Sequence, residues 1–149
     1  NGRTLQFNST NANARHIIKL DGADYITFNE LVIDGSAAAA TYAWGVHFIN
    51  GADYNTFNLC TIKTSKTNIT SGNHYPVVMS SSITSPTTAG NSGNYNTFQD
   101  NTFIGGYYAV TVCGTGAGSE ITNNYFANNI IQDYYGYGIT LAIYVFKRC

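Results

Sequence analysis

Apolar and polar residues alternate in short runs along this chain, and Gly, Asn, Asp and Ser fill the stretches between the runs. Each run reads apolar, variable, apolar, which is the period of a β-strand with one buried face and differs from the 3.6-residue period of a helix. The intervening residue types accept tight-turn backbone conformations with little strain. The pattern predicts no helix, and it predicts strands at Ile18–Leu20, Val46–Phe48, Val77–Met79, Val110–Val112 and Ile139–Leu141.

A second set of strands is marked by a recurring phenylalanine. The phrase Asp-Tyr-x-Thr-Phe-Asn occurs at 24–29 and again at 53–58, Tyr-Asn-Thr-Phe follows at 95–98, and a weaker copy ends at 126. Self-similarity at a period of roughly 20 to 50 residues is typical of stacked repeat units. The anchors of the predicted coils are Phe28, Phe57, Phe98 and Phe126.

The repeat predicts an all-β fold, a right-handed parallel β-helix (solenoid) of about four to five coils, as a single domain over 1–149. The phenylalanines would then form an internal ladder at the strand spacing of about 4.8 Å. Asn101 and Asn129 occupy equivalent positions three residues after their phenylalanines, so we expect them to form an asparagine ladder. Insertion loops are expected at about 65–75 and 80–94, either as sites of functional contact or as solvated excursions.

Composition narrows the function classes. Charged residues make up 10% of the chain and aromatic residues 14%, with 12 tyrosines, a balance typical of secreted β-rich proteins. A net charge of −1 offers no electrostatic surface for nucleic acid, and no apolar run is long enough for membrane insertion. We therefore expect an extracellular or cell-surface location.

Both ends of the chain differ from a capped solenoid. Asn1–Phe7 resembles half a coil, and the atypical tail 142–149 leaves the repeat without a polar cap. Either the tail folds over the end of the stack, or the chain is a fragment of a longer array, which we expect, with self-association through uncapped coil ends or Cys149. Cys60 and Cys113 fit small buried side chains, and the disulfide state of the three cysteines stays open.

The repeat resembles a known family of folds. Tyr-Asn-Thr-Phe-Gln-Asp-Asn-Thr-Phe-Ile-Gly-Gly (95–106), Asn-Asn-Tyr-Phe-Ala-Asn-Asn-Ile-Ile-Gln-Asp (123–133) and Tyr-Gly-Ile-Thr-Leu (137–141) look like the right-handed parallel β-helix repeat, over about residues 4 to 141. Leu-Asp-Gly-Ala-Asp-Tyr-Ile-Thr-Phe and the Ser-rich insertion are similar to secreted or cell-surface arrays of Bacteroidota. Relatives of the fold include polysaccharide lyases, hydrolases, tailspikes and adhesins, so the resemblance implies a fold and not one chemistry.

Asp24 and Asp53 are the carboxylates that best fit catalysis, because they are equivalent positions one coil apart and would stack at about the spacing of a retaining pair. Each also precedes a Tyr-x-Thr-Phe strand, where Asp commonly caps a turn, and Asn94 takes the place in the next coil. His16, His47 and His74 show no metal-ligand spacing, so we expect no metal and no other cofactor. We expect His47 to be outward and solvated, and His74 to lie in a loop.

Aromatic residues precede the upstream strand in successive coils and would align along one edge of the stack. Flat rings along a surface suit stacking against sugar rings, and tyrosine hydroxyls add hydrogen bonds. The rings could instead pack on one another and close the corner of each coil. The members of this aromatic edge are Tyr42, Trp44, His74, Tyr75, Tyr107, Tyr108, Tyr134, Tyr135 and Tyr137.

Two functions remain as expectations. The first is a structural or adhesive module, leaning away from catalysis, that contacts a polysaccharide or cell-surface glycan through the aromatic edge. The second is a carbohydrate-active enzyme, a polysaccharide lyase or glycoside hydrolase, using Asp24 and Asp53. An outward threonine row resembles those of ice-binding β-helices, but Tyr125 interrupts it. The absence of a charged cluster in the columns favours the first function.

Overall fold

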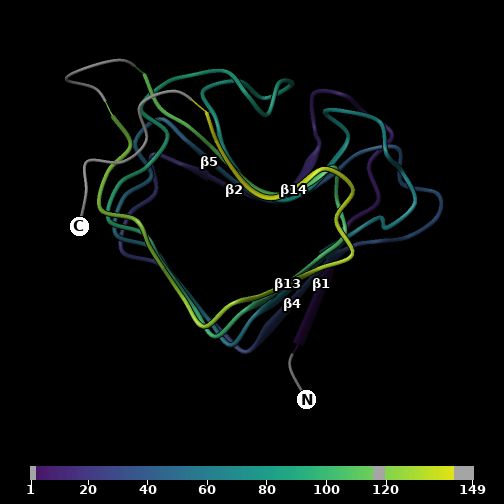
Figure 1. Ribbon diagram of the computed structural model, residues 1–149, viewed down its shortest axis with the longest axis horizontal. Coiled ribbons are helices and arrows are strands. Elements are labelled where there is room, and N and C mark those ends of the chain that lie inside the picture. Colours follow the sequence, from purple (N-terminus) through teal and green to yellow (C-terminus); the bar gives the residue numbers. More distant parts are fainter. Residues whose placement is uncertain (1–2, 116–119, 143–149) are drawn as a thin grey trace.

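The strands stack as a right-handed parallel β-solenoid. The computed structural model describes residues 3–115 and 120–142, which form 14 strands and no helix. In Figure 1 the chain runs counterclockwise around the axis and the later coils lie nearer the viewer, which makes the winding right-handed. The strands form three parallel sheets over about five turns, which confirms the predicted fold class.

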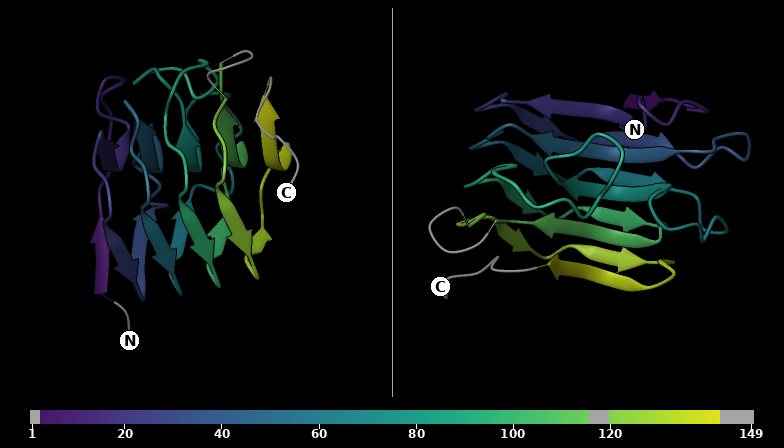
Figure 2. Two further views of the ribbon diagram at one scale, coloured as in Figure 1. Left: turned by 90° about the vertical axis from the view of Figure 1, so that its left-hand side faces the viewer. Right: turned by 90° about the horizontal axis from the view of Figure 1, so that it is seen from above.

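Each complete coil contributes one strand to each sheet (Figure 2). Sheet one contains β2 (His16–Asp21), β5 (Ala43–Ile49), β8 (His74–Met79), β11 (Tyr108–Cys113) and β14 (Tyr137–Ala142). Sheet two contains β3 (Thr27–Asn29), β6 (Thr56–Asn58), β9 (Thr97–Gln99) and β12 (Tyr125–Ala127). Sheet three contains β1 (Arg3–Gln6), β4 (Leu31–Gly35), β7 (Thr61–Thr64), β10 (Thr102–Ile104) and β13 (Ile130–Gln132).

The core is built from columns of equivalent side chains. Phe28, Phe57, Phe98 and Phe126 are register partners in sheet two. Their rings stack with successive centroid separations of 4.6, 5.3 and 4.7 Å. Sheet three adds the column Ile33, Ile62, Phe103 and Ile131, and sheet one adds Leu20, Phe48, Met79 and Val112. The predicted phenylalanine ladder is thereby confirmed.

Two corners flank sheet two in every coil, and both use left-handed backbone at residues other than glycine. The residue three positions before each phenylalanine has φ of 57° or 58°, and the residue two positions after it has φ of 53° or 54°. Such a conformation costs an ordinary side chain about 1 kcal/mol or more. The residues are Tyr25, Tyr54, Tyr95 and Asn123 at the first corner, and Glu30, Leu59, Asp100 and Asn128 at the second.

Asparagine ladders offset that strain. At the second corner, Asn101 donates its backbone N–H to Asn129 Oδ1 (2.9 Å), and Asn101 Nδ2 donates to Phe57 O (2.9 Å), as the sequence predicted. At the first corner, Asn55 donates its backbone N–H to Asn96 Oδ1 (2.8 Å), and Asn96 Nδ2 donates to Ala52 O (3.0 Å). The ladder at the first corner was not predicted from the sequence. Both ladders satisfy backbone groups that the bends leave unpaired.

The insertion loops differ slightly from their predicted bounds. The first ends earlier than expected, because His74 and Tyr75 already belong to β8. The second runs from the end of β8 to β9 and contains no strand. Cys60 and Cys113 are buried free thiols. The predicted C-terminal tail, apart from its first residue, and Cys149 lie outside the described residues.

Candidate functional site

The aromatic edge is buried at its centre. Trp44 and Tyr75 are register partners in sheet one, and neither side chain is accessible to solvent. The loop that ends the first insertion covers them: Trp44 Nε1 donates to Gly72 O (2.9 Å), and Gly72 N–H donates to Tyr75 Oη (3.1 Å). These two rings therefore close the corner of their coils, and a ligand cannot stack on them in this structure.

The guanidinium group of Arg15 lies over the face of the Tyr42 ring. Its guanidinium carbon lies 4.3 Å from the Tyr42 ring centroid and 5.6 Å from that of Trp44. Arg15 Nη1 also donates to Gly72 O (2.7 Å), so one cation connects three surface segments. Cation–π contacts of this kind stabilise a fold by about 0.5 to 2 kcal/mol. Tyr42 is thus half-buried and already partnered.

The aromatic edge is exposed at its C-terminal end. Tyr107 and Tyr108 are half-buried, whereas Tyr135 and Tyr137 are 58% and 64% exposed and Tyr134 is also exposed. The rings of Tyr107 and Tyr135 are tilted by 44° and those of Tyr108 and Tyr137 by 37°, with both centroid separations at 5.4 Å. Because tilted rings do not cover one another, part of each ring face stays open. We call Tyr107, Tyr108, Tyr134, Tyr135 and Tyr137 the tyrosine edge.

A second tyrosine row was missed by the sequence interpretation. Tyr25, Tyr54 and Tyr95 stack at 4.9 and 4.7 Å with interplanar angles of 4° and 7°, and all three are exposed. Desolvation, followed by the neighbouring phenols of Tyr95 and Tyr25, raises the pKa of Tyr54. Parallel stacking covers the ring faces, so this row presents edges and hydroxyls. Its signal was present in the sequence, because a tyrosine precedes Phe28, Phe57 and Phe98 by three residues each time.

Asp24 and Asp53 are used as caps between coils. Asp24 Oδ1 accepts the backbone N–H of Asp53 (2.8 Å), and Asp53 Oδ1 accepts the backbone N–H of Asn94 (2.6 Å). Asn94 Oδ1 continues the chain of bonds by accepting the N–H of Thr122 (2.7 Å). A neutral amide performs the same task in the third coil, which agrees with turn capping and not with an acid–base pair.

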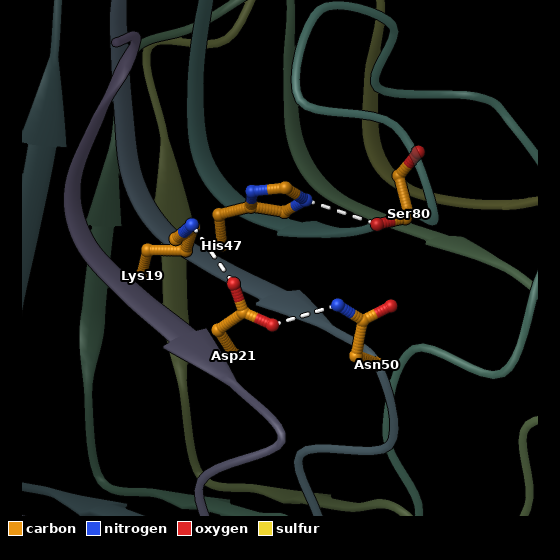
Figure 3. Close-up of polar contacts among 5 residues, drawn as sticks. All are labelled: Lys19, Asp21, His47, Asn50 and Ser80. Carbon is orange, nitrogen blue, oxygen red and sulfur yellow. Dashed lines mark hydrogen bonds and ion pairs between the residues drawn. The ribbon is translucent and has the colours of Figure 1, made fainter.

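His47 corrects a prediction, because it is fully buried instead of solvated. Its side chain does belong to the outward row of sheet one, next to Lys19 and Val78 in the register, but the segment after β8 folds over it (Figure 3). His47 Nε2 lies 2.9 Å from Ser80 O. Since a carbonyl oxygen only accepts, Nε2 carries the proton, and Nδ1 is a buried acceptor without a partner. Burial lowers the pKa of His47 to about 4.

Polar groups of β2 and of the turn after β5 lie beside His47 (Figure 3). Lys19 Nζ is 2.9 Å from Asp21 Oδ2, and Asn50 Nδ2 donates to Asp21 Oδ1 (2.7 Å). The hydrogen bonds from Lys19 and then from Asn50 lower the pKa of Asp21. The His16 ring lies 6.0 Å from the His47 ring, and burial lowers the pKa of His16 as well. His74 is likewise buried, in β8 and not in a loop.

Among residues 3–115 and 120–142, no three or more His, Cys, Asp or Glu side chains are grouped so that they could hold a metal ion. In the same part of the chain, no helix has the length and apolar character needed to cross a membrane.

Comparisons of the sequence with protein-family models and curated proteins, and of the chain with solved structures, found no match.

Proposed function

We propose that this chain is a rigid, non-catalytic module of an extracellular or bacterial cell-surface β-helix array, similar to those of Bacteroidota, and that it binds a polysaccharide or cell-surface glycan through the tyrosine edge. The observation that carries the proposal is the exposure of Tyr135 and Tyr137, at 58% and 64%, with tilted rings on a rigid sheet. Tyrosine offers a flat apolar face and a hydroxyl at low cost in side-chain entropy, which suits sugar rings.

The remaining aromatic residues support the scaffold in this proposal. Trp44 and Tyr75 form the buried part of the same row, and each holds the loop at Gly72. The exposed rings therefore stand on packed rings beneath them, since the Tyr108 centroid lies 5.9 Å from that of Tyr75. A preorganised surface loses less entropy on binding than a mobile one.

A lyase or hydrolase is the second candidate, and the geometry supports it less well. Either reaction needs a carboxylate or another base directed at the substrate. The carboxylates of Asp24 and Asp53 instead accept backbone N–H groups of the following coils. Asp34 and Asp133 are paired with Lys63 and Lys66 at 3.0 and 2.6 Å.

Binding to a panel of purified plant, algal and bacterial polysaccharides tests the proposal by affinity electrophoresis and by calorimetry. We expect the double variant Tyr135→Ala/Tyr137→Ala to bind its best polysaccharide at least about tenfold more weakly than the wild type, because two stacking contacts at about 1 kcal/mol each are lost. The matched control is Tyr25→Ala/Tyr54→Ala, which removes two exposed tyrosines of the other row and should change affinity less than about twofold.

Equal weakening by both double variants would contradict the assignment to the tyrosine edge. Failure of the wild-type chain to bind any polysaccharide would leave only the spacer role. Release of shorter sugars from any of them would instead support the enzyme.

A further inference from the structure

The segment 80–94, which we call the cover loop, lies over the outer face of sheet one (Figures 1 and 2). It is held in shape largely by its own polar groups: Ser80 Oγ donates to Ser85 O (2.7 Å), and Ser81 Oγ donates to Ala89 O (2.7 Å). Of its apolar residues, Ile83 is exposed and Pro86 is buried, and the loop contains no charged residue. A loop with so little apolar burial belongs to the part of a fold that opens most easily.

The two ends of the cover loop are bonded into the coils: Ser80 N–H donates to Phe48 O (3.3 Å), and the carbonyls of Asn91, Ser92 and Asn94 accept the N–H groups of Gly51, Ala52 and Tyr54 (2.9, 3.2 and 3.0 Å). Three further contacts attach the loop to the sheet beneath it. His47 Nε2 donates to Ser80 O (2.9 Å) at one end. Gly90 N–H donates to Cys113 O (3.2 Å) at the other end, and Cys113 Sγ lies 3.7 Å from Pro86 O. His47 is the member of this set that titrates in mildly acidic solution. The loop is therefore attached in part through the protonation state of a buried imidazole.

The surroundings of His47 oppose a second proton. From β2, Lys19, Asp21 and His16 face it, and Asp21 is already paired with Lys19 at 2.9 Å. From its own strand, the Trp44 ring lies edge-on at 5.1 Å. From β8 its register partner is the neutral Val78, and the cover loop brings no charge. A proton on Nδ1 would thus create a buried cation with an unpaired N–H, beside an ammonium group and a second imidazole.

We propose that residues 81–90 of the cover loop are an acid-released lid: a proton taken from solvent at His47 Nδ1 favours a state in which these residues leave sheet one, the imidazolium is hydrated, and the Cys113 thiol becomes accessible. The step is proton binding alone, with no covalent bond formed or broken. The bond from Nε2 to Ser80 O can persist in the charged ring, whereas Nδ1–H, which has no partner in the closed state, is satisfied by water once the ring is exposed.

The direction and size of the pH effect on lid opening follow from proton linkage. With the loop closed, burial holds the His47 pKa at about 4, against 6.5 for a hydrated ring. The closed state is therefore fully favoured above pH 6.5 and loses ground as the pH falls towards 4, because the open state binds the proton more tightly in that window. If the open ring regains its ordinary pKa, the ratio of open to closed lid rises about 30-fold between pH 8 and pH 5.

The two buried cysteines make the lid measurable in the full chain carrying Cys149→Ser. The probe is 4,4′-dithiodipyridine, and the labelled site is identified by mass spectrometry. Dividing each rate by that of the urea-unfolded chain at the same pH cancels the ionisation of the thiol itself. We expect the protection of Cys113 to fall about 30-fold between pH 8 and pH 5. Cys60, which lies in the core against the backbone of Phe28, should keep its protection.

The variant His47→Gln is the matched test, because its amide can donate to Ser80 O but cannot gain a charge. It should hold the protection of Cys113 constant over the same pH range. The proposal is overturned if Cys113 protection in the wild type is independent of pH, if Cys60 and Cys113 lose protection together, or if the fall persists in His47→Gln. Should that variant not fold, hydrogen exchange of the amides of 81–90 in the wild type decides, since faster exchange in acid confined to this segment is required after correction for intrinsic rates.

Discussion

Sheet two and the outer face of sheet one are built on opposite principles. In sheet two the same residue recurs from coil to coil, as in the phenylalanine column and the row Thr27, Thr56 and Thr97. On the outer face of sheet one the register partners Lys19, His47 and Val78 have three different chemistries. The difference teaches that repeated residues stabilise the fold and set its register, whereas residues of differing chemistry are concentrated where loops cover the long strands of sheet one.

The largest loss of stability is expected from breaking the repeated column at its centre. Phe98 is fully buried and stacks between Phe57 and Phe126, with Phe48 and Phe103 edge-on beside it. Phe98→Ala removes these contacts and leaves a cavity, so we expect the free energy of unfolding in urea to fall by about 3 to 5 kcal/mol. The half-buried Phe28 has one ring neighbour in the column and provides the control, since Phe28→Ala should cost clearly less.

The next largest loss of stability is expected from breaking the asparagine ladder at the first corner, which contains Asn55 and Asn96 and which we call the inner ladder. Asn96→Ala leaves the buried backbone N–H of Asn55 and the carbonyl of Ala52 without their partners, and we expect a cost of about 2 to 4 kcal/mol in the same assay. Asn58→Ala is the matched control, because Asn58 donates to Asn29 Oδ1 (2.8 Å) on the exposed side of the same sheet. An equal cost for both variants would show that the inner ladder does not offset the corner strain.

A smaller effect is expected on the irregular side. Arg15→Gln loses the cation over Tyr42 and the bond to Gly72 O, which together should stabilise the loops by about 1 to 2 kcal/mol. Trp44 is the one tryptophan of the chain, so its fluorescence reports directly whether the loop at Gly72 still covers it. We expect its emission to move to longer wavelength and to be quenched more readily by acrylamide. The exposed Arg3 supplies the control, and Arg3→Gln should leave the spectrum unchanged.

The smallest effect is expected for the exposed tyrosine row. Tyr54 stacks between Tyr25 and Tyr95, and such pairs contribute about 0.5 to 1.5 kcal/mol beyond burial. Because Tyr54 also has a left-handed backbone, Tyr54→Gly relieves strain while it removes the ring, whereas Tyr54→Ala only removes the ring. Urea unfolding should rank the wild type above both, with the glycine variant no less stable than the alanine variant.

The repeated features were readable from the sequence, and the covered ones were not. The phenylalanine columns and the ladder from Asn101 to Asn129 repeat the same residue types at the same offset, so stacking could be predicted from the text. The burial of His47 could not, because the cover loop is polar and unrepeated and carries no apolar pattern that indicates packing. The burial of Trp44 and Tyr75 could not be predicted for the same reason, because the loop that covers them is held by hydrogen bonds to the carbonyl and N–H of Gly72.

The register of the coils is the claim on which the columns, the ladders and both tyrosine rows depend. Nitroxide labels on cysteines at Thr56 and Thr97, with Cys149→Ser, test it by the line width of their electron paramagnetic resonance spectrum. The two positions are 41 residues apart in the chain but are register partners in adjacent strands. At about 4.8 Å between strands we predict strong spin–spin broadening, and clearly weaker broadening for the pair Thr27 and Thr97, which is about twice as far apart. Equal broadening for both pairs, or none for Thr56 and Thr97, would contradict the stacking of equivalent residues.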